Sequence, residues 1–500
     1  MAKDPVTVSK SAFELQEICE VVTNGEVCNQ PNPFQPSKNE MSYSNKVFNA
    51  KDVDNGIEID RQFSILSLNS ELVIGGIPYT KYWQNKHNNY IFHPMRFGRY
   101  ISKIMENNEW RNLFPEIVRK IGIRLPNNSI AFYYPKYYSL GRMKGPDLTY
   151  SAISQAEILA GVIRYDQLEK STESKKLVNA IKESLFFPYE QGGVELAGIA
   201  QLEIPLFRGN PEIVLNGWLH ALIHLNDFAI LYKDSKTRDY IRESLKFFAD
   251  NYQAWYDEQR NISLYSDTSP HRVFLKVKKK VDTPKLFVVY QAKDKKLPNY
   301  IFELGEDEGE KYSLFDNKIY AIETKSNRFR MTLNCSRLYE TKVVSSDSFT
   351  LSVRDGGYSP TGSAPDGVGG RWNDIESFKI RNGMYEVDFK LKDRELICGY
   401  PTNFAKYTGK NYYHVYHIVA LLYLALTPSF DDVELSRKVT SIALEWWGRT
   451  KDFKNRPYSD FENPDVILKG INEGKILKTI PSASELFRQA TSSLKSFRKL

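Results

Sequence analysis

The spacing between apolar residues changes twice along this chain, and these changes limit the folds it can adopt. In residues 93–256 apolar side chains recur every three or four positions, the spacing of one helix face. Residues 271–399 instead alternate apolar and polar side chains, as strands of an antiparallel sandwich do. The helical spacing then returns at 411–447. We therefore predict a multidomain α+β protein in which a β-sandwich-like domain, 271–399, is inserted into a helical domain.

The helical segments come in pairs. Each pair can bury its inner face against the next, as in helical bundles and barrels. The segments are 95–105, 110–121, 150–165, 173–186, 211–232, 237–256, 411–426 and 432–447. About four such pairs predict an (α/α) toroid or barrel formed by residues 93–270 and 400–500, which the last pair completes. The alternative is a continuous two-domain chain whose last helices form a separate tail.

The N-terminal part of the chain follows neither long pattern. Residues 1–45 are polar and include the run Asn-Gln-Pro-Asn-Pro-Phe-Gln-Pro, so we predict a loosely ordered polar arm. Residues 46–92 carry short alternating runs between turn residues, which predict an N-terminal β region.

Charge and aromatic content narrow the classes of partner. The formal net charge of +7 agrees with an acidic polymer as partner, because polyanions bind through summed long-range attraction. The 31 Tyr and 28 Phe supply rings that can stack on sugar faces. The alternative is that a chain rich in Tyr, Lys and Asn reflects an AT-rich genome. The sequence has no Arg/Lys-rich arm and no recognisable nucleic-acid motif, so nucleic acid is not an expected partner.

Cysteine usage and hydropathy set expectations for the compartment. The chain has no CxxC pair, so we expect no structural zinc site and reduced thiols in a reducing compartment. The four cysteines are Cys19, Cys28, Cys335 and Cys398. No apolar run reaches the length of a membrane span, and residues 1–16 lack the apolar core of a signal peptide. These features together predict a cytoplasmic, bacterial protein.

One carboxylate occupies a position suited to chemistry. Glu203 stands just before Pro205 and a loop, which then runs into a strongly apolar helix through Asn216-Gly217-Trp218. This order places one acid at the mouth of a helical scaffold, where a reacting group can meet it. The alternative is that Glu203 is a solvated loop acid or a helix-capping acid.

Two tyrosines can lie at the same end of the predicted toroid as this acid. Tyr265 follows the third helix pair, where its alternative role is that of a packed aromatic in a turn. Tyr413 opens the fourth pair, within about one helical turn of His414 and His417. We therefore treat Tyr265 and Tyr413 as candidates for proton transfer or for hydrogen bonding to an intermediate.

A second histidine pair raises the question of a metal. His220 and His224 have the i, i+4 spacing that can bind zinc. The helix lacks an HExxH glutamate, and no third dependable ligand is visible in the spacing. Histidines on apolar helices are more often core residues, so we expect no transition metal in the chemistry.

Cationic and aromatic residues in two loops are candidates for contact with an acidic sugar. Arg142 and Lys144 can face a carboxylate, and arginine does so through two hydrogen bonds. The alternative is a basic surface loop. The Gly-Gly-Arg-Trp run at 369–372 is a looser candidate for sugar contact.

These elements, in this order, resemble the C-terminal domain of the D-glucuronyl C5-epimerases, enzymes that invert uronic acid residues inside a polysaccharide. The matching runs are Tyr150-Ser-Ala-Ile-Ser-Gln155, Leu202-Glu-Ile-Pro205, Val214-Leu-Asn-Gly-Trp218 and Tyr413-His-Val-Tyr-His417. They cover a little under half of the chain. The resemblance implies an (α/α) barrel with a cleft for an extended polysaccharide, in which Glu203, Tyr265 and Tyr413 are catalytic.

The resemblance also implies a set of substrate-binding residues. Lys410 stands where the animal enzymes have arginine, and Ile204 stands where they have tyrosine. The predicted substrate contacts, including the loop cations, are Arg142, Lys144, Tyr150, Gln155, Asn216, Lys410, His414 and His417.

The expected reaction is proton abstraction and return at C5 of glucuronate or iduronate residues in a polymer such as a heparosan-like glycosaminoglycan or capsule polysaccharide. It requires no cofactor. A polysaccharide lyase that begins with the same abstraction is one alternative, and a non-catalytic glycan-binding protein is another. The sequence leaves open whether the protein forms a homodimer.

Overall fold

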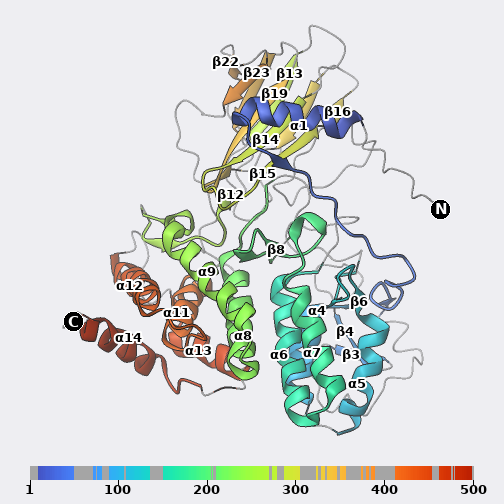
Figure 1. Cartoon of the computed structure of the whole chain (residues 1–500), viewed down its shortest axis with the longest axis vertical. Coiled ribbons are helices and arrows are strands. Elements are labelled where there is room, and N and C mark those ends of the chain that lie inside the picture. The colour runs from blue at the N-terminus through green and yellow to red at the C-terminus, as the bar shows by residue number, and fades with distance from the viewer. Residues whose placement is uncertain are drawn as a thin grey trace. The chain divides into compact units, whose positions relative to one another are not determined.

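The structure, a computed structural model, contains both helices and sheets, as predicted, and its chain divides into two compact units (Figure 1). The β unit comprises Met1–Asn32, Leu206–Glu212 and Ser266–Tyr400, and the helical unit comprises Pro33–Pro205, Ile213–Tyr265 and Pro401–Leu500. The residues that the structure describes are 10–49, 71–74, 76–81, 89–105, 108–135, 150–203, 205, 210–258, 260–269, 273–278, 286–304, 322–324, 328–332, 335–345, 350–355, 373–375, 379–381, 384–388, 411–452, 461–474, 477 and 479–497.

The longer helices of the helical unit pack in two rows. In the first row α4 contacts α6, α6 contacts α8, and α8 contacts α11. The second row covers the first through α6–α7, α8–α9 and α11–α12 contacts, and α9 also contacts α12. The bounds are α4 Pro94–Ile104, α6 Ala152–Glu169, α7 Thr172–Ser184, α8 Leu215–Tyr232, α9 Ser235–Asn251, α11 Tyr412–Leu426 and α12 Val433–Arg449.

Local sequence explains where the second-row helices begin. The side chains of Ser171, Asp234 and Asp432 each accept a hydrogen bond from a backbone N–H in the first turn of the helix that follows. Such caps satisfy donors that have no partner inside the helix. In contrast, α8 and α11 are apolar around most of their circumference, as expected for helices buried on nearly all sides.

Smaller elements complete the helical unit. A four-stranded antiparallel sheet has the order β2-β5-β4-β3 and falls within the segment predicted as an N-terminal β region. Two further helices, α13 and α14, contact α11. The bounds are β2 Val47–Phe48, β3 Glu71–Ile74, β4 Ile77–Lys81, β5 Tyr90–Phe92, α5 Asn108–Ile121, β6 Ile123–Arg124, β7 Ile130–Ala131, β8 Glu195–Leu196, β9 Ala200–Gln201, β10 Tyr256–Asp257, β11 Ile262–Ser263, α13 Pro464–Glu473 and α14 Ala483–Phe497.

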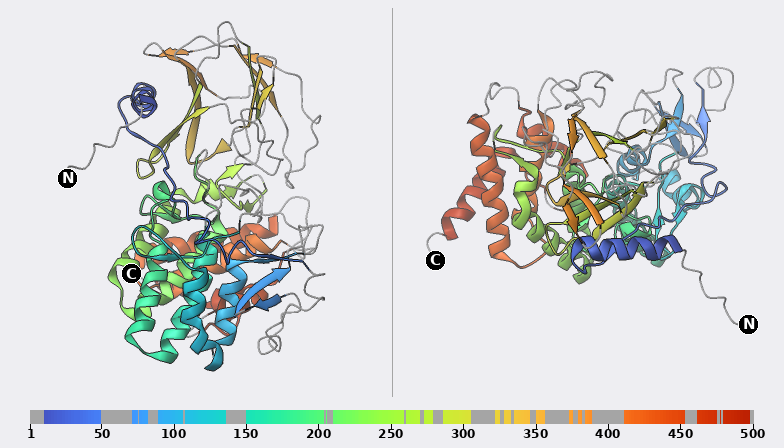
Figure 2. Two further views of the ribbon diagram at one scale, coloured as in Figure 1. Left: turned by 90° about the vertical axis from the view of Figure 1, so that its right-hand side faces the viewer. Right: turned by 90° about the horizontal axis from the view of Figure 1, so that it is seen from above.

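Besides a small antiparallel pair formed by β12 and β18, the β unit contains two larger sheets that lie as separate layers (Figure 2). One has the order β1-β15-β14-β19-β23-β22 and the other β16-β17-β13-β20-β21, and all their pairings are antiparallel except β1–β15. The bounds are β1 Cys28–Asn29, β12 Thr268–Ser269, β13 Val273–Lys278, β14 Leu286–Ala292, β15 Asn299–Leu304, β16 Ile322–Thr324, β17 Arg328–Thr332, β18 Cys335–Ser336, β19 Tyr339–Ser345, β20 Thr350–Asp355, β21 Asn373–Ile375, β22 Lys379–Arg381 and β23 Met384–Asp388.

The N-terminal segment differs from the predicted loosely ordered arm. Residues Lys10–Thr23 form helix α1, and the strand β1 that follows pairs in parallel with β15. Leu15, Ile18 and Val22 of α1 form an apolar cluster with side chains of β14, β15 and β19, such as Phe287 and Ile301. Their i, i+3, i+7 spacing is that of one helix face, but the polar and Pro-rich residues that follow the helix favoured the prediction of an arm.

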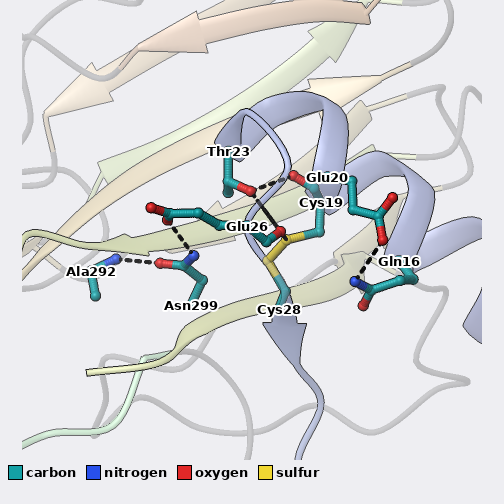
Figure 3. Close-up of a disulfide and its surroundings, with 8 residues drawn as sticks. All are labelled: Gln16, Cys19, Glu20, Thr23, Glu26, Cys28, Ala292 and Asn299. Carbon is teal, nitrogen blue, oxygen red and sulfur yellow. Dashed lines mark hydrogen bonds between the residues drawn. A yellow bond between two sulfur atoms is a disulfide. The ribbon is translucent and has the colours of Figure 1, made fainter. Parts of the chain in front are cut away.

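A disulfide joins Cys19 of α1 to Cys28 of β1 (Figure 3). Beside it Thr23 donates a hydrogen bond to the carbonyl of Glu26, and Asn299 donates one to the Glu26 carboxylate. The expectation of reduced cysteines is therefore wrong for this pair, and the argument from cysteine usage for a reducing compartment falls with it. The spacing of the two cysteines could not reveal the pair. A short loop without a metal-binding motif gives no signal of whether its cysteines are bonded to each other.

Within the described part of the chain, none of the helices combines the length and the apolar character that crossing a membrane would require.

Candidate active site

A cavity of about 700 Å³ opens within the helical unit. Its wall is formed mainly by α4, α6, α8 and α11, with contributions from α13, from Glu203 before α8 and from Tyr265 after β11. Many of the side chains that line the cavity are polar, namely Arg96, Arg99, Glu157, Glu203, Asn216, His220, His224, Tyr265, Tyr412, Tyr413 and Tyr416. A concave site with a few converging polar groups is the usual form of a small-ligand or active site.

Glu203 is buried in this wall with 6% of its surface exposed. Its Oε1 accepts a hydrogen bond from the Tyr265 hydroxyl at 3.0 Å, and its Oε2 accepts one from Asn216 Nδ2 at 3.1 Å. Asn216 belongs to the first turn of α8, where the helix dipole favours a negative charge. The Glu203 carboxylate is thus held by two hydrogen bonds and faces the cavity. These contacts argue against the alternative of a solvated loop acid.

Gly217 makes the approach of Glu203 to α8 possible. A Cβ atom at this position would overlap Glu203 Oε2 and lie 2.5 Å from Glu203 Cβ. No side chain larger than hydrogen fits between the helix and the carboxylate. The Asn-Gly pair therefore supplies both the amide that binds Glu203 and the space that Glu203 occupies.

The two predicted catalytic tyrosines meet beside Glu203. The rings of Tyr265 and Tyr413 pack edge to face, with centroids 5.1 Å apart. The Tyr265 carbonyl accepts a hydrogen bond from the Leu215 amide at 2.8 Å, which ties the Tyr265 backbone to the start of α8. Burial raises the pKa of Tyr413 well above its usual range, and the charge of Glu203 raises it further. Tyr413 is therefore a neutral phenol, able to donate a proton, at ordinary pH.

A second group of charged residues lies on the same wall. Arg99 of α4 forms an ion pair with Glu157 of α6 at 3.2 Å, and His220 Nε2 approaches the same carboxylate oxygen at 3.2 Å. Burial alone would raise the pKa of Glu157, but the hydrogen bond and charge of His220 and the charges of Arg99 and His224 lower it to about 2. Glu157 is thus ionised, and Arg99 is the cation nearest to it.

The close crossing of α4 and α6 creates this ion pair. A Cβ atom on Gly98 would lie 2.7 Å from the Glu157 carbonyl carbon, so the two helices approach backbone to backbone at this point. Arg99, the next residue, is carried to the side of Glu157 as a result. Sequence analysis missed both residues, since each looks like an ordinary charged residue within its own helix.

Three predicted substrate-binding residues lie outside the described part of the chain, namely Arg142, Lys144 and Lys410, as does the 369–372 run. Asn216 does line the cavity, but its observed contact is with Glu203.

Tyr150 and Gln155 hold the fold together, and they are not among the residues that line the cavity. Both are fully buried. The Tyr150 hydroxyl donates to the Ser184 carbonyl at 2.7 Å, and Gln155 exchanges hydrogen bonds with the backbone of Ile130 and Phe132. The observed polar contacts of both side chains are thus with backbone groups, and their role in binding substrate stays a prediction.

His414 and His417 are likewise buried core residues outside the cavity wall. The Ser263 hydroxyl lies 2.8 Å from Nδ1 of each ring, and the Ser263 amide donates to His414 Nδ1 at 2.9 Å. Burial lowers the pKa of His414 to about 3 and lowers that of His417 well below its usual range. Both rings are therefore neutral and share the Ser263 hydroxyl, and their role as substrate contacts stays a prediction.

His220 and His224 do reach the cavity, and the structure adds a third ligand-type group beside them. The ligand atoms of Glu157, His220 and His224 all lie within 4.8 Å of one another. The argument that this histidine pair lacks a third ligand was therefore wrong. Glu157 could have been noticed as the lone acid in the apolar run Ala-Glu-Ile-Leu-Ala-Gly of its helix.

Comparisons of the chain with models of protein families, with curated proteins and with solved structures give no match. The chemistry of the site is therefore argued from its own geometry.

Proposed function

We propose that the helical unit is a C5-epimerase acting on uronic acid residues, of the glucuronate and iduronate type, within an acidic polysaccharide. The observation that carries this proposal is the hydrogen bond of 3.0 Å from Tyr265 to the buried carboxylate of Glu203, with Tyr413 packed against the Tyr265 ring. A carboxylate as base and a neutral acid beside it are the groups that inversion at carbon requires.

In the proposed reaction, Glu203 takes the C5 proton of a uronate residue. The hydrogen is weakly acidic because it lies α to the sugar carboxylate, and the electron pair moves onto the carboxylate oxygens. Tyr413 then gives its phenolic proton to C5 on the opposite face. The proton on Glu203 returns to the Tyr413 oxygen, with the Tyr265 hydroxyl as the relay, so that the enzyme is restored.

The electrostatics of the wall support these roles. Tyr413 has a raised pKa because of burial and the neighbouring Glu203 charge, which favours the phenol over phenolate. It is therefore suited to donate a proton and unsuited to act as the first base. Arg99 is a cation of the described cavity wall that can face the charge developing on the substrate carboxylate.

The proposal includes an (α/α) toroid of about four helix pairs as the scaffold. Two observations support it. Helices α4, α6, α8 and α11 contact one another in sequence, and α6, α8 and α11 are each covered by a second-row helix. The open cavity and the arginine and tyrosine side chains that line it support an acidic polysaccharide as the partner.

Solvent exchange at C5 tests the proposal. The protein is incubated in D₂O with a panel of uronate polymers, and deuterium at C5 is measured by NMR or mass spectrometry. We expect incorporation without an ultraviolet-absorbing unsaturated uronate. Formation of that product would identify a lyase instead, and binding without exchange would identify a glycan-binding protein.

A variant pair ties the activity to the site. Glu203→Gln keeps the volume and can still accept the Asn216 hydrogen bond through its amide oxygen, but it cannot accept the proton, so exchange should fall by about 10²- to 10⁴-fold. Glu195→Gln is the matched control, because Glu195 is a partly buried acid in β8 that is not among the residues lining the cavity. Near-wild-type exchange in Glu203→Gln would refute the assignment.

A further inference from the structure

Three groups that commonly ligate metals converge on one point of the cavity wall. Glu157 lies on α6, and His220 and His224 lie one turn apart on α8. His220 Nε2 is 3.2 Å from Glu157 Oε1 and 3.2 Å from His224 Nε2. All three residues line the cavity of about 700 Å³, so their meeting point is accessible from it.

These distances match the edges of a tetrahedral metal site. Zinc binds imidazole nitrogen and carboxylate oxygen at about 2.0–2.2 Å, and two such ligands at the tetrahedral angle lie about 3.3 Å apart. Two His and one Glu with an open fourth position are also a known ligand set of catalytic zinc sites.

Neighbouring side chains contact two of these groups and orient them. The Tyr416 hydroxyl lies 2.8 Å from His220 Nδ1, which leaves Nε2 as the ring atom directed toward Glu157 and His224. Arg99 Nε binds the Glu157 carboxylate at 3.2 Å. Hydrogen bonds of this kind orient ligating rings and carboxylates in metal proteins.

The electrostatics of the cluster call for a cation at its centre. Glu157 and His224 are buried, with 7% and 3% of their surfaces exposed. Two imidazole nitrogens and a carboxylate oxygen that face one another repel through their lone pairs unless a proton or a metal ion lies between them. A divalent ion can satisfy all three at once, whereas a proton on one ring satisfies fewer of them.

We propose that Glu157, His220 and His224 bind one divalent transition-metal ion of the zinc type. Its open coordination position faces the cavity. Resting on the proposed function, we assign that position to the carboxylate of the uronate residue, where the ion would neutralise charge that develops during proton abstraction.

Metal binding to the full chain tests the site independently of catalysis. The protein is stripped with a chelator, freed of it, and titrated with Zn²⁺ by calorimetry, with elemental analysis of the product. We expect one ion per chain. Glu157→Gln and His224→Gln should each weaken binding more than about 100-fold, and Tyr416→Phe should weaken it by about 10- to 100-fold.

His93→Gln is the matched control, because His93 lines the same cavity outside the three-residue cluster and should leave zinc affinity unchanged. X-ray absorption at the zinc edge of the wild-type protein provides a measurement that does not depend on variant folding, and it should detect two imidazoles and oxygen ligands. Absence of stoichiometric zinc, or equal binding in wild type and both ligand variants, would overturn the site.

The role of the open position is tested with Co²⁺ in place of zinc. Addition of a glucuronate-containing oligosaccharide should change the visible absorption of the bound Co²⁺. An unchanged spectrum under saturating oligosaccharide would overturn the carboxylate assignment while leaving the metal site intact. Failure of C5 exchange on every polymer would refute the proposed function without affecting the zinc stoichiometry.

Discussion

Tyr265 donates a hydrogen bond to Glu203 across 3.0 Å, although 62 residues separate them in the chain. The same carboxylate is held from its other side by Asn216, and the Tyr265 ring contacts that of Tyr413. The acid is thus fixed by two donors while a third residue stands next to them. Glu203, Tyr265 and Tyr413 thus form one continuous group in the wall of the cavity.

Replacing each tyrosine by phenylalanine should separate their roles. Tyr413→Phe removes the proposed proton donor, so C5 exchange should fall by about 10²- to 10⁴-fold. Tyr265→Phe removes one hydrogen bond to a charged group, worth about 1.5–3 kcal/mol, and also the proposed proton relay, so the loss should be at least tens of fold. Both rings and their edge-to-face contact are kept. Wild-type exchange rates in both folded variants would show that the hydroxyls are irrelevant.

A methyl group at Gly217 should disable the site by displacing Glu203. The added Cβ would lie 2.5 Å from Glu203 Cβ, and a reacting group misplaced by about 1 Å can lose about 10²-fold in rate. We therefore expect Gly217→Ala to fold and to lose at least that much C5 exchange.

Gly448→Ala is the matched control for this substitution. Gly448 also lies in a helix, α12, is not among the residues that line the cavity, and a Cβ there meets no heavy atom within 4 Å. The control should keep wild-type exchange and gain about 0.5–1 kcal/mol of stability, because alanine favours the helix. Equal activity of both alanine variants would contradict the claim that Gly217 makes room for Glu203.

The sequence predicted the helices better than the site, for a physical reason. Helix α11, Tyr412–Leu426, agrees with the predicted segment 411–426, because apolar spacing and the cap at Asn411 are local features. The pair Arg99 and Glu157 depends instead on how closely α4 crosses α6, which no local spacing encodes.

The surroundings of the histidines could not be read from the sequence for a related reason. A polar residue on an apolar helix can face a cavity or be buried with a partner, and the sequence does not say which. His220 and His224 face the cavity, whereas His414 and His417 share the hydroxyl of Ser263 in the core. The partner lies more than 150 residues away in the chain, so only the fold could assign it.

Removal of the disulfide should weaken the β unit. Cys19 and Cys28 are nine residues apart, and closing a loop of that length stabilises a fold by about 2–3 kcal/mol. The double variant Cys19→Ser, Cys28→Ser should lower the denaturant midpoint of the β unit and leave C5 exchange unchanged. Reducing agent should destabilise the wild-type protein but not the variant. Rapid labelling of Cys19 and Cys28 in the native, unreduced protein would contradict the bond.

Acidification should weaken the helical unit through its buried histidines. The pKa of His414 falls from 6.5 to about 3 on burial, so between these values the unfolded chain binds a proton that the folded chain does not. The contribution of this residue to stability is fully present above pH 6.5 and is lost progressively as the pH falls toward 3. Between pH 7 and pH 5 the free energy of unfolding should drop by about 2 kcal/mol for this histidine alone.

The variant His414→Asn tests this origin of the pH dependence. Its amide oxygen can still accept the hydrogen bond from the Ser263 amide that His414 Nδ1 accepts at 2.9 Å, but it does not titrate. Urea unfolding of wild type and variant at pH 7 and pH 5 gives the comparison, and the quantity of interest is the change with pH within each protein. A smaller change in the variant is expected because one proton-binding group has been removed from the unfolded chain. An identical change in both proteins would show that His414 is not the group whose protonation destabilises the fold.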